Sequence, residues 1–563
     1  MTKLKDTTFQ LDIPEQFRVF LKSRGVEGED QLRRFLLPRL ADLPRPEQMA
    51  NLTTAAELVA EALRHDREII IWGDYDVDGT TGTALLVNFF KEYGARVSWH
   101  IPNRFTEGYG LNSQWFRDRA SASRNRDFLL ITVDCGISNR EQVAEIQRLG
   151  ATVIVTDHHQ LPAEGLPQCL IVNPSLPHCG FHGHQLSGAG VAFYLAAAIK
   201  TILAPRFTHI QINLKQYLAF VALGTVADVV PMTATNRILV RAGLEALTST
   251  PFQGVKQLLS SCSIAGADLY SEDIAFFLGP KINAAGRLGD SDLAVSLLTE
   301  ESASHAKKLA ARLTLLNDQR KALCGEILEK AVSELSPGEI QQAQCIIVKE
   351  VSHQGVAGIV ASKLVELFGF PALVFAKKEN QNAAPLYVGS ARSVEGIDMV
   401  DMLRQCAPLL ERYGGHKMAA GLSLREDAFP AFAKAFSQLA AKAYEDRAPL
   451  TRRRFDIPCA VDELLTERYL NIFKYLDPFG PGNEAPIFFD KQSKIVDART
   501  VGREMEHLQV SIRGRYANHK GIGFGLGKKI SEVQSNPTRS LLYSPTVNRY
   551  RGTVSWQVRV IDL

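Results

Sequence analysis

The feature that constrains this chain most is a series of short apolar runs separated by stretches with helical spacing. The runs are rich in Ile, Leu, Val and Thr, and they cover residues 69–72, 96–101, 128–133, 152–155 and 169–172. Each has the length of one buried strand, and helices such as 83–93 and 139–149 are expected between them. Short apolar strands that alternate with helices predict a parallel sheet covered on both faces. The expected fold class is therefore α/β.

Acidic residues directly follow three of these strands. They are Asp74 and Asp76 after the first strand, Asp134 after the third, and Asp157 with His158 and His159 after the fourth. In an open parallel sheet, ligands bind beyond the carboxyl ends of the strands. We therefore expect these side chains to share one crevice. Asp228, which lies in the run 224–230, is a further candidate for the same crevice.

So many carboxylates in one crevice repel one another and are costly to remove from water. A divalent cation resolves this problem, and carboxylates with a neutral imidazole suit Mg²⁺ or Mn²⁺. The residues suffice for two ions roughly 3.5–4 Å apart, an arrangement that activates a water for phosphoryl displacement. A single Asp-x-Asp at a strand end is more often only a turn, and paired histidines are often incidental. Three acidic strand ends together favour the metal interpretation.

The rest of the chain predicts several further parts. A long helix is expected over 303–330, and a second α/β pattern begins with the strand 345–348 and includes a helix over 399–412. Short glycine-rich strands at 493–501, 507–512, 521–527 and 553–561 predict a small barrel. The expected division is 1–50 helical preface, 51–300 catalytic domain, 301–340 connecting helix, 341–448 second α/β domain and 449–563 barrel.

The acidic motifs, in their order along the chain, resemble those of the DHH superfamily of phosphoesterases. They are the segments 74–79, 133–137, 157–159 and 227–228. The resemblance implies that two divalent ions, Mn²⁺ or Mg²⁺, are bound by Asp74, Asp76, Asp134, His158 and Asp228. It also implies that Asp157 and His159 act beside the metals, orienting ligands or the scissile phosphate. The chain departs from many relatives at Trp72, where they carry a histidine, so one imidazole contact fewer is expected.

Two further segments, 279–287 and 414–416, resemble the single-strand-specific exonuclease branch of this superfamily. Residues 283–287 are expected to form a loop that presents Arg287, and the resemblance implies that Arg287 contacts the DNA backbone near the cut. A surface arginine at a helix start is the alternative. In the second α/β domain, which resembles the DHH-associated domain, the substrate-binding candidates are Ser390, Arg392, Gly414, Gly415 and His416. For the glycine pair alone, a tight turn is the simpler interpretation.

The resemblance implies a metal-dependent exonuclease that degrades single-stranded DNA from its 5′ end, in DNA recombination and repair. It also implies a passage between two lobes that is too narrow for duplex DNA, fed by a C-terminal OB-fold barrel. The alternatives are a DHH phosphoesterase acting on short oligonucleotides or cyclic dinucleotides, and a non-catalytic DNA-binding scaffold. Basic and aromatic side chains of the barrel are candidate DNA contacts: Arg452, Arg453, Arg454, Arg513, Arg515, Tyr516, Lys520 and Phe524.

Charge and cysteine usage add little to this picture. From residue 450 onward the chain has 18 Lys and Arg against 12 Asp and Glu, which is compatible with a polyanionic partner. The eight cysteines show no paired spacing, and no apolar leader is evident, so a cytoplasmic protein is expected. A monomer is also expected. Single-strand-binding protein and a RecQ-type helicase are partners that the resemblance implies. The cluster His178, Cys179, His182 and His184 is incomplete as a structural zinc site.

Overall fold

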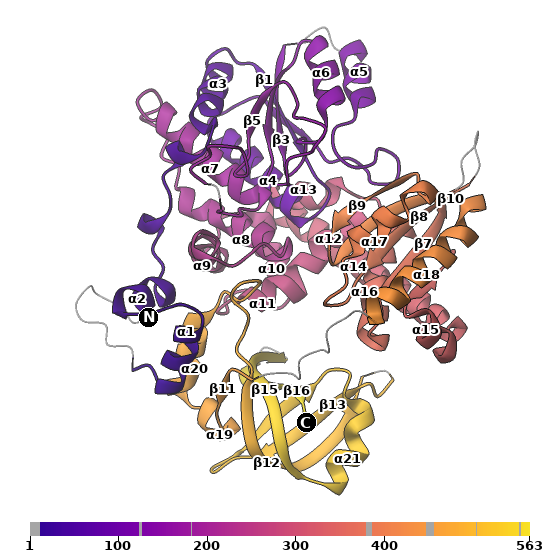
Figure 1. The fold of residues 1–563 in the computed structure, drawn as a ribbon. Helices are drawn as coiled ribbons and strands as arrows, with labels where there is room; N and C mark the ends of the chain where they lie inside the picture. The colour runs from indigo at the N-terminus through magenta and orange to yellow at the C-terminus, as the bar shows by residue number, and fades with distance from the viewer. Residues whose placement is uncertain are drawn as a thin grey trace. The chain divides into compact units, whose positions relative to one another are not determined.

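The computed structural model of the chain describes residues 12–122, 127–181, 183–378, 385–445, 455–502, 504–550 and 553–563 (Figure 1). The chain has two compact units. The first comprises Met1–Ile282, Asp292–Ala310 and Arg453–Leu563, and the second comprises Asn283–Ser291 and Ala311–Arg452. In the described part of the chain, no helix combines the length and the apolar character that crossing a membrane requires.

The first unit contains the predicted parallel sheet. Its strands are β1 (Glu68–Gly73), β2 (Val97–His100), β3 (Phe128–Val133), β4 (Thr152–Thr156) and β5 (Leu170–Val172), in the order β2-β1-β3-β4-β5. All pairings are parallel. All six residues of β3 are buried, as expected for a central strand with both faces covered. The expected α/β fold class is confirmed.

Helices cover both faces of this sheet. Three pack together on one face, α3 (Leu52–Arg64), α4 (Val77–Glu92) and α7 (Gly188–Leu203), whereas α5 (Ser113–Ala122) and α6 (Arg140–Arg148) lie on the other (Figure 1). Helix α4 begins at Val77, six residues before the expected start at 83, because Asp76 caps it by accepting a hydrogen bond from the Gly79 N–H. The early start places Asp78 inside the helix, facing the interior.

A series of helices follows the sheet along the chain. It consists of η3 (Leu214–Tyr217), α8 (Leu218–Ala227), α9 (Ala234–Thr248), α10 (Gln253–Ser261), α11 (Ser271–Asp273), the π-helix η4 (Ile274–Leu278), α12 (Gly279–Arg287), α13 (Asp292–Leu298) and α14 (Ala303–Glu334). The long helix expected over 303–330 is confirmed as α14. The loop expected at 283–287 is wrong, because these residues belong to α12. Ala284 and Ala285, strong helix formers, are fully buried there.

The barrel of the first unit has the strand order β11-β12-β13-β14-β16-β15 and closes through β12 and β15. Its elements are β11 (Ile457–Pro458), α19 (Val461–Leu464), α20 (Glu467–Leu476), β12 (Phe488–Val501), β13 (His507–Arg513), β14 (Asn518–Gly523), η8 (Gly527–Lys529), α21 (Ile530–Ser535), β15 (Thr538–Tyr550) and β16 (Thr553–Asp562). Strand β15 was not predicted, and Pro545 in its middle weakens the strand pattern.

The N-terminal helices belong to the same hydrophobic core as the barrel. They are α1 (Glu15–Ser23) and α2 (Glu29–Leu36), and two short 3-10 turns follow, η1 (Leu40–Asp42) and η2 (Pro46–Gln48). Phe17 packs against Tyr469 of α20 and Phe488 of β12, with ring centroids 5.7 and 5.9 Å apart. The helical preface therefore packs on the barrel rather than standing alone.

The second unit is built on a mixed sheet with the strand order β6-β7-β8-β10-β9. Its elements are α15 (Pro337–Ala343), β6 (Ile346–Val348), η5 (Gln354–Val356), α16 (Ala357–Phe368), β7 (Ala372–Lys378), β8 (Leu386–Arg392), α17 (Met399–Gln405), η6 (Ala407–Leu409), β9 (Arg412–His416), β10 (Ala419–Arg425), η7 (Glu426–Ala428) and α18 (Phe429–Glu445). The helix expected to run to 412 ends at Gln405, because Pro408 cannot continue it. Gly414, Gly415 and His416 lie in the strand β9 rather than in a tight turn.

Candidate metal centre and substrate-binding face

The parallel register aligns the strand ends that carry the acidic side chains. Gly73 of β1 pairs with Val133 of β3, and Val133 pairs with Thr156 of β4. The next residues of these strands are Asp74, Asp134 and Asp157. The sheet edge therefore brings the three aspartates into one row, as predicted. Asp228 joins them as the residue that caps the C-terminus of α8.

The side chains at this edge form one compact cluster. His158 Nε2 lies 3.0 Å from a carboxylate oxygen of Asp134 and 3.6 Å from one of Asp228. Three overlapping groups each place their ligand atoms within 4.8 Å of one another: Asp74, Asp76 and Asp134; Asp134, His158 and His159; Asp78, His158 and Asp228. The cluster contains all five predicted metal ligands.

Three buried atoms of this cluster have no hydrogen-bond partner among the described residues. They are Asp74 Oδ1, Asp134 Oδ1 and His158 Nε2. Although His158 Nε2 lies close to Asp134, their geometry does not make a hydrogen bond. A buried polar atom without a partner is costly, so atoms that converge in this way need a shared partner. Carboxylate oxygens and an imidazole nitrogen are suitable ligands for Mn²⁺ or Mg²⁺.

The electrostatics of the cluster support the same fit. Burial, reinforced by the charge of Asp76, raises the pKa of Asp74 well above its usual range. Burial and the charges of Asp78, Asp76, Asp74 and Asp228 do the same to the pKa of Asp134. Burial lowers the pKa of His158, which keeps its imidazole neutral and able to bind a metal. A divalent cation would relieve the repulsion that raises the carboxyl pKa values.

Two residues of the site have strained backbones. Asp134 has a φ of 63°, and Val229, directly after Asp228, has a φ of 59°. A non-glycine residue in this left-handed region costs free energy and persists only where the surrounding structure enforces it. Both strained residues lie in segments that carry a carboxylate of the cluster, Asp134 itself and Asp228.

Asp157 acts on its histidine neighbours through a dense set of hydrogen bonds. Its carboxylate accepts the backbone N–H groups of Ile137, His158 and His159, at 2.8–3.0 Å, and contacts the His159 ring nitrogen Nδ1 at 2.7 Å. Burial would raise the pKa of Asp157, but these contacts hold it below its usual value. Burial likewise opposes protonation of His159, yet the Asp157 carboxylate raises its pKa to about 9. The Asp157 carboxylate therefore favours the protonated form of the His159 imidazole.

Asp78 is a site residue that sequence reasoning did not single out. Its carboxylate is fully buried and accepts the backbone N–H groups of Gly188 and Ala189, at the start of α7. One of its oxygens lies 3.8 Å from His158 Nε2. Gly224 of α8 is required beside it, because a Cβ there would lie 2.3 Å from Asp78 Oδ1. The third aspartate of the Asp-x-Asp-x-Asp run was the signal available in the sequence.

The loop after β2 adds side chains that were also not predicted. Arg104 lies over the ring of Tyr75 at 4.5 Å, and the ring of Tyr109 lies 6.2 Å from that of His159. Trp72 points the other way: its indole N–H donates to the Gly110 carbonyl, and its ring packs on Phe116 in the core. The departure at Trp72 therefore leaves the five predicted ligands in place.

The substrate-binding candidates of the second unit share one sheet. Arg392 pairs with Ala419, which pairs with His416, and Ser390 pairs with Gly421, which pairs with Gly414. Rows two residues apart point to the same face of a sheet, so Ser390, Arg392, Gly414 and His416 line one face. The space above Gly414 and Gly421 is open. Gly415 alternates to the opposite face.

Helix α16 begins beside these side chains. Gly358, in its first turn, leaves room for Ser390 and Arg392, because a Cβ there would lie 2.8 Å from both side chains. Arg287, at the end of α12, donates to the Gly355 carbonyl at 3.2 Å. Two guanidinium groups thus flank the N-terminus of a 12-residue helix, where the backbone N–H groups favour an anion.

The remaining candidates have varied outcomes. Cys179 Sγ accepts the Ala50 N–H, and the His184 ring contacts the Thr235 hydroxyl at 2.6 Å, so neither converges on a zinc site. In the barrel, Tyr516 is 88% exposed beside Arg515, and Phe524 is 60% exposed. His182 and Arg452, Arg453 and Arg454 lie outside the described residues.

A parallel sheet with an acidic metal centre at its edge defines a metal-dependent phosphoesterase, and the domain matches agree. Residues 68–225 match the DHH family N-terminal domain, 341–442 the DHHA1 domain and 455–562 the RecJ OB domain. The chain belongs to the RecJ family of single-stranded-DNA-specific exonucleases.

Relatives of this family match the chain over nearly its whole length. The Escherichia coli RecJ exonuclease is 35% identical over 98% of this chain and 96% of that protein. The Bacillus subtilis RecJ exonuclease is 32% identical over 100% of this chain and 69% of that protein. The crystal structure of Thermus thermophilus RecJ with Mn²⁺ has a TM-score of 0.79 at 31% identity, covering 98% of this chain and 76% of that one. A Mg²⁺ complex of the same protein also matches, with a TM-score of 0.72 at 29% identity over 98% of this chain and 75% of that one.

Proposed function

We propose that the chain hydrolyses the phosphodiester bonds of single-stranded DNA from the 5′ end, using two divalent ions at the edge of its parallel sheet. The observation that carries the proposal is the convergence of Asp74, Asp134 and His158, whose buried atoms have no hydrogen-bond partner within the described part of the chain. The relatives are named single-stranded-DNA-specific exonucleases, which supplies the substrate class.

The ions would be held by Asp74, Asp76, Asp134, His158 and Asp228. When bound, divalent ions supply a nucleophilic water at neutral pH and stabilise charge that develops on the phosphate. Asp157 fixes the backbone that carries His158 and His159 through its accepted hydrogen bonds. His159, held by Asp157 through its ring nitrogen Nδ1, would offer a ring N–H to a phosphate oxygen of the substrate.

The second unit would bind phosphate groups of the strand. Arg287 and Arg392 flank the start of α16, and Ser390 adds a hydroxyl beside Arg392 at 3.2 Å. The open backbone at Gly414 allows a nucleotide to approach the sheet closely, with Gly415 shaping the same strand and His416 as a further donor. We assign the 5′ terminal phosphate to this set of donors, which would give the reaction its direction.

The same proposal covers organisation and partners. The working parts are the preface 1–50, the catalytic domain 51–300, the connecting helix 301–340, the DHH-associated domain 341–448 and the barrel 449–563. The chain would act in the cytoplasm as a monomer, in DNA recombination and repair, with single-strand-binding protein and a RecQ-type helicase. Tyr516 and Phe524 of the barrel suit the stacking of bases.

Digestion of end-labelled DNA tests this function. The wild-type chain should shorten single strands from the 5′ end with Mn²⁺ or Mg²⁺, and should spare duplex DNA of the same sequence. Asp76→Ala should abolish the reaction, whereas Asp497→Ala, at an exposed position of β12, should leave it unchanged. A wild-type chain that is silent with both metals at every salt concentration would contradict the proposal. Faster turnover of a dinucleotide than of a long strand would favour the short-oligonucleotide alternative.

A further inference from the structure

Two adjacent phenylalanines are exposed on the short π-helix Ile274–Leu278. Phe276 is 64% exposed and Phe277 is 47% exposed, whereas Ile274 and Leu278 at the two ends are fully buried. Large apolar side chains that stand together in solvent mark interaction sites more often than they contribute to stability. Single-turn π-helices are also concentrated at functional sites. This turn inserts one extra residue, which lets both ends stay buried while the two rings face outward.

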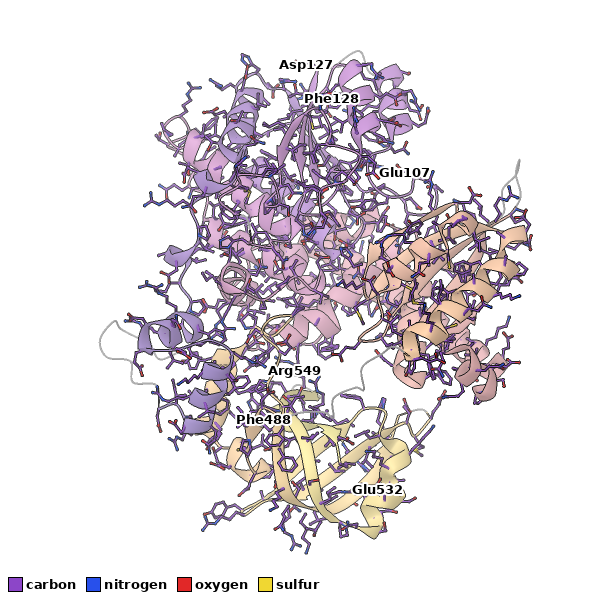
Figure 2. All side chains as sticks on the ribbon, in the orientation of Figure 1. Glu107, Asp127, Phe128, Phe488, Glu532 and Arg549 are labelled. Carbon is purple, nitrogen blue, oxygen red and sulfur yellow. The ribbon has the colours of Figure 1, made fainter. Side chains whose placement is uncertain are left out.

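The chain just before the π-helix is fixed to the barrel. Asp273 forms a two-pronged ion pair with Arg549 of β15, labelled in Figure 2, at 3.0 and 2.8 Å, and both side chains are nearly buried. Glu272 accepts the Thr546 hydroxyl at 3.1 Å. Ser271 donates its hydroxyl to Asp477, in the segment that enters the barrel, at 2.6 Å. Helix α11 is therefore anchored to the barrel by several polar contacts.

The chain just after the π-helix lies against α8, the helix that precedes Asp228. An added Cβ on Gly279 would lie 3.5 Å from the Ala227 Cβ, an ordinary van der Waals distance, and the π-helix itself packs against α8. Ala227 is the last residue of α8, and Asp228 of the metal cluster follows it. In Figure 1 the segment that begins at α11 lies between the parallel-sheet domain and the barrel of the same unit. Val229, directly after Asp228, is a third exposed apolar side chain at this end of α8.

The two phenylalanines thus lie on the short segment between Asp273, which binds the barrel, and Gly279, which lies against α8. The first end of this segment binds the OB domain, and the second end contacts α8, the helix that precedes Asp228. Every base offers a flat face to an aromatic ring. Exposed aromatic rings on this segment therefore suit a single DNA strand of any sequence that passes from the barrel to the metal centre.

We propose that Phe276 and Phe277 form a base-stacking step that positions single-stranded DNA between the OB domain and the metal centre. This inference rests on the proposed function and names two substrate-binding residues for it. The phenylalanines increase the affinity for strands long enough to reach them. They do not act on the phosphate that is cut, and they do not discriminate between bases.

The variants Phe276→Ala, Phe277→Ala and the double change test this step on the full chain. For a strand of about 20 nucleotides with Mn²⁺, we expect KM to rise at least about 5-fold in the double variant, because one or two base stacks are lost. The value of kcat should stay within about twofold, and dinucleotide turnover should be unchanged. Val19→Ala, at another exposed apolar side chain, is the matched control and should behave as wild type.

Strands that carry one abasic site, moved stepwise from the 5′ end, give a readout that a folding defect would not produce. The wild-type enzyme should show a raised KM when the missing base falls at one or two particular positions. The double variant should lose that position dependence, because it has no ring to stack there. An identical abasic profile in both proteins, or an unchanged KM on intact strands, would overturn the stacking role. A wild-type enzyme that is inactive on every strand would instead reject the proposed function itself.

Discussion

Replacement of the Asp228 carboxylate tests the electrostatics of the metal centre through the stability of the metal-free protein. Burial, with the charges of Asp78 and Asp76, raises the pKa of Asp228 from 3.8 to about 8. The same carboxyl is ionised in the unfolded chain at pH 7. Folding without metal must therefore either protonate Asp228 or hold its charge against its neighbours. Asp228→Asn removes this cost, so the variant should be more stable than wild type when metal is absent.

The pKa sets the size of the effect. One pKa unit corresponds to about 1.4 kcal/mol, so the interval from 3.8 to pH 7 gives an upper limit of about 4 kcal/mol. The measured gain should lie below this limit, because Asp134 and Asp74 can take up a proton instead. A gain of about 2 kcal/mol, half of this limit, corresponds to a rise in Tm of roughly 4–8 °C for a domain of about 150–250 residues.

The sign of the pH dependence follows from the raised pKa. Below about pH 4 the carboxyl is protonated in both states, so it does not affect stability. Between about pH 4 and 8 the unfolded chain loses the proton first, and the wild-type protein becomes progressively less stable. Above about pH 8 the carboxyl is ionised in both states, so its destabilising effect on the folded protein no longer changes with pH. The difference in Tm between variant and wild type should therefore grow from pH 5 to pH 8.

Calorimetry in a chelating buffer measures this difference, with Asp497→Asn as the control at an exposed position of β12. Added Mn²⁺ should reverse the order, because the wild-type protein has one more ligand and gains more stability from the ion. If Asp228→Asn is less stable than wild type in the chelator at every pH, the carboxylates do not repel one another as described.

Three further changes probe the site and the second unit. Asp157→Asn replaces a carboxylate that contacts Ile137, His158 and His159 with an amide that has only one acceptor oxygen. The value of kcat should therefore fall roughly 10- to 100-fold at saturating Mn²⁺. Full activity in steady-state assays would refute the positioning role. Gly358→Ala would bring a Cβ within 2.8 Å of the Ser390 and Arg392 side chains. The loss of one charged hydrogen bond to the substrate should raise KM about tenfold, with little change in kcat. Gly325→Ala on α14, where an added Cβ meets open space, should have no effect. Arg392→Ala should lower the slope of log KM against log salt concentration by about 0.7, the loss of one phosphate contact on a single strand; an unchanged slope, or an equal loss in Arg404→Ala, would place the phosphate elsewhere.

The sequence predicted the parallel sheet and its acidic edge because both signals are local. Strands such as 128–133 are continuous apolar runs, and the aspartates follow them directly, so strand order did not need to be known. The five predicted ligands come together in the structure. The role of Asp78 was not visible, because it depends on contacts with Gly188 and Gly224, more than 100 residues away.

Other misses have the same origin in tertiary contacts. Residues 283–287 were expected to form a loop, but burial of Ala284 and Ala285 keeps them helical. Strand β15 is held by pairing with β12 and β16, although Pro545 weakens its local pattern. The exposed phenylalanines of the π-helix gave no sequence signal, because an apolar pair inside a helical stretch normally indicates a buried face.

Anomalous X-ray diffraction from crystals grown with Mn²⁺ tests the central claim most directly. The account predicts two manganese peaks at the edge of the parallel sheet, one contacted by Asp74 and Asp76 and one by His158 and Asp228, with Asp134 between them. Asp134→Ala should remove or weaken both peaks in crystals of the same form. Manganese bound away from this edge, or no peak at Asp74, Asp134 and His158, would contradict the account.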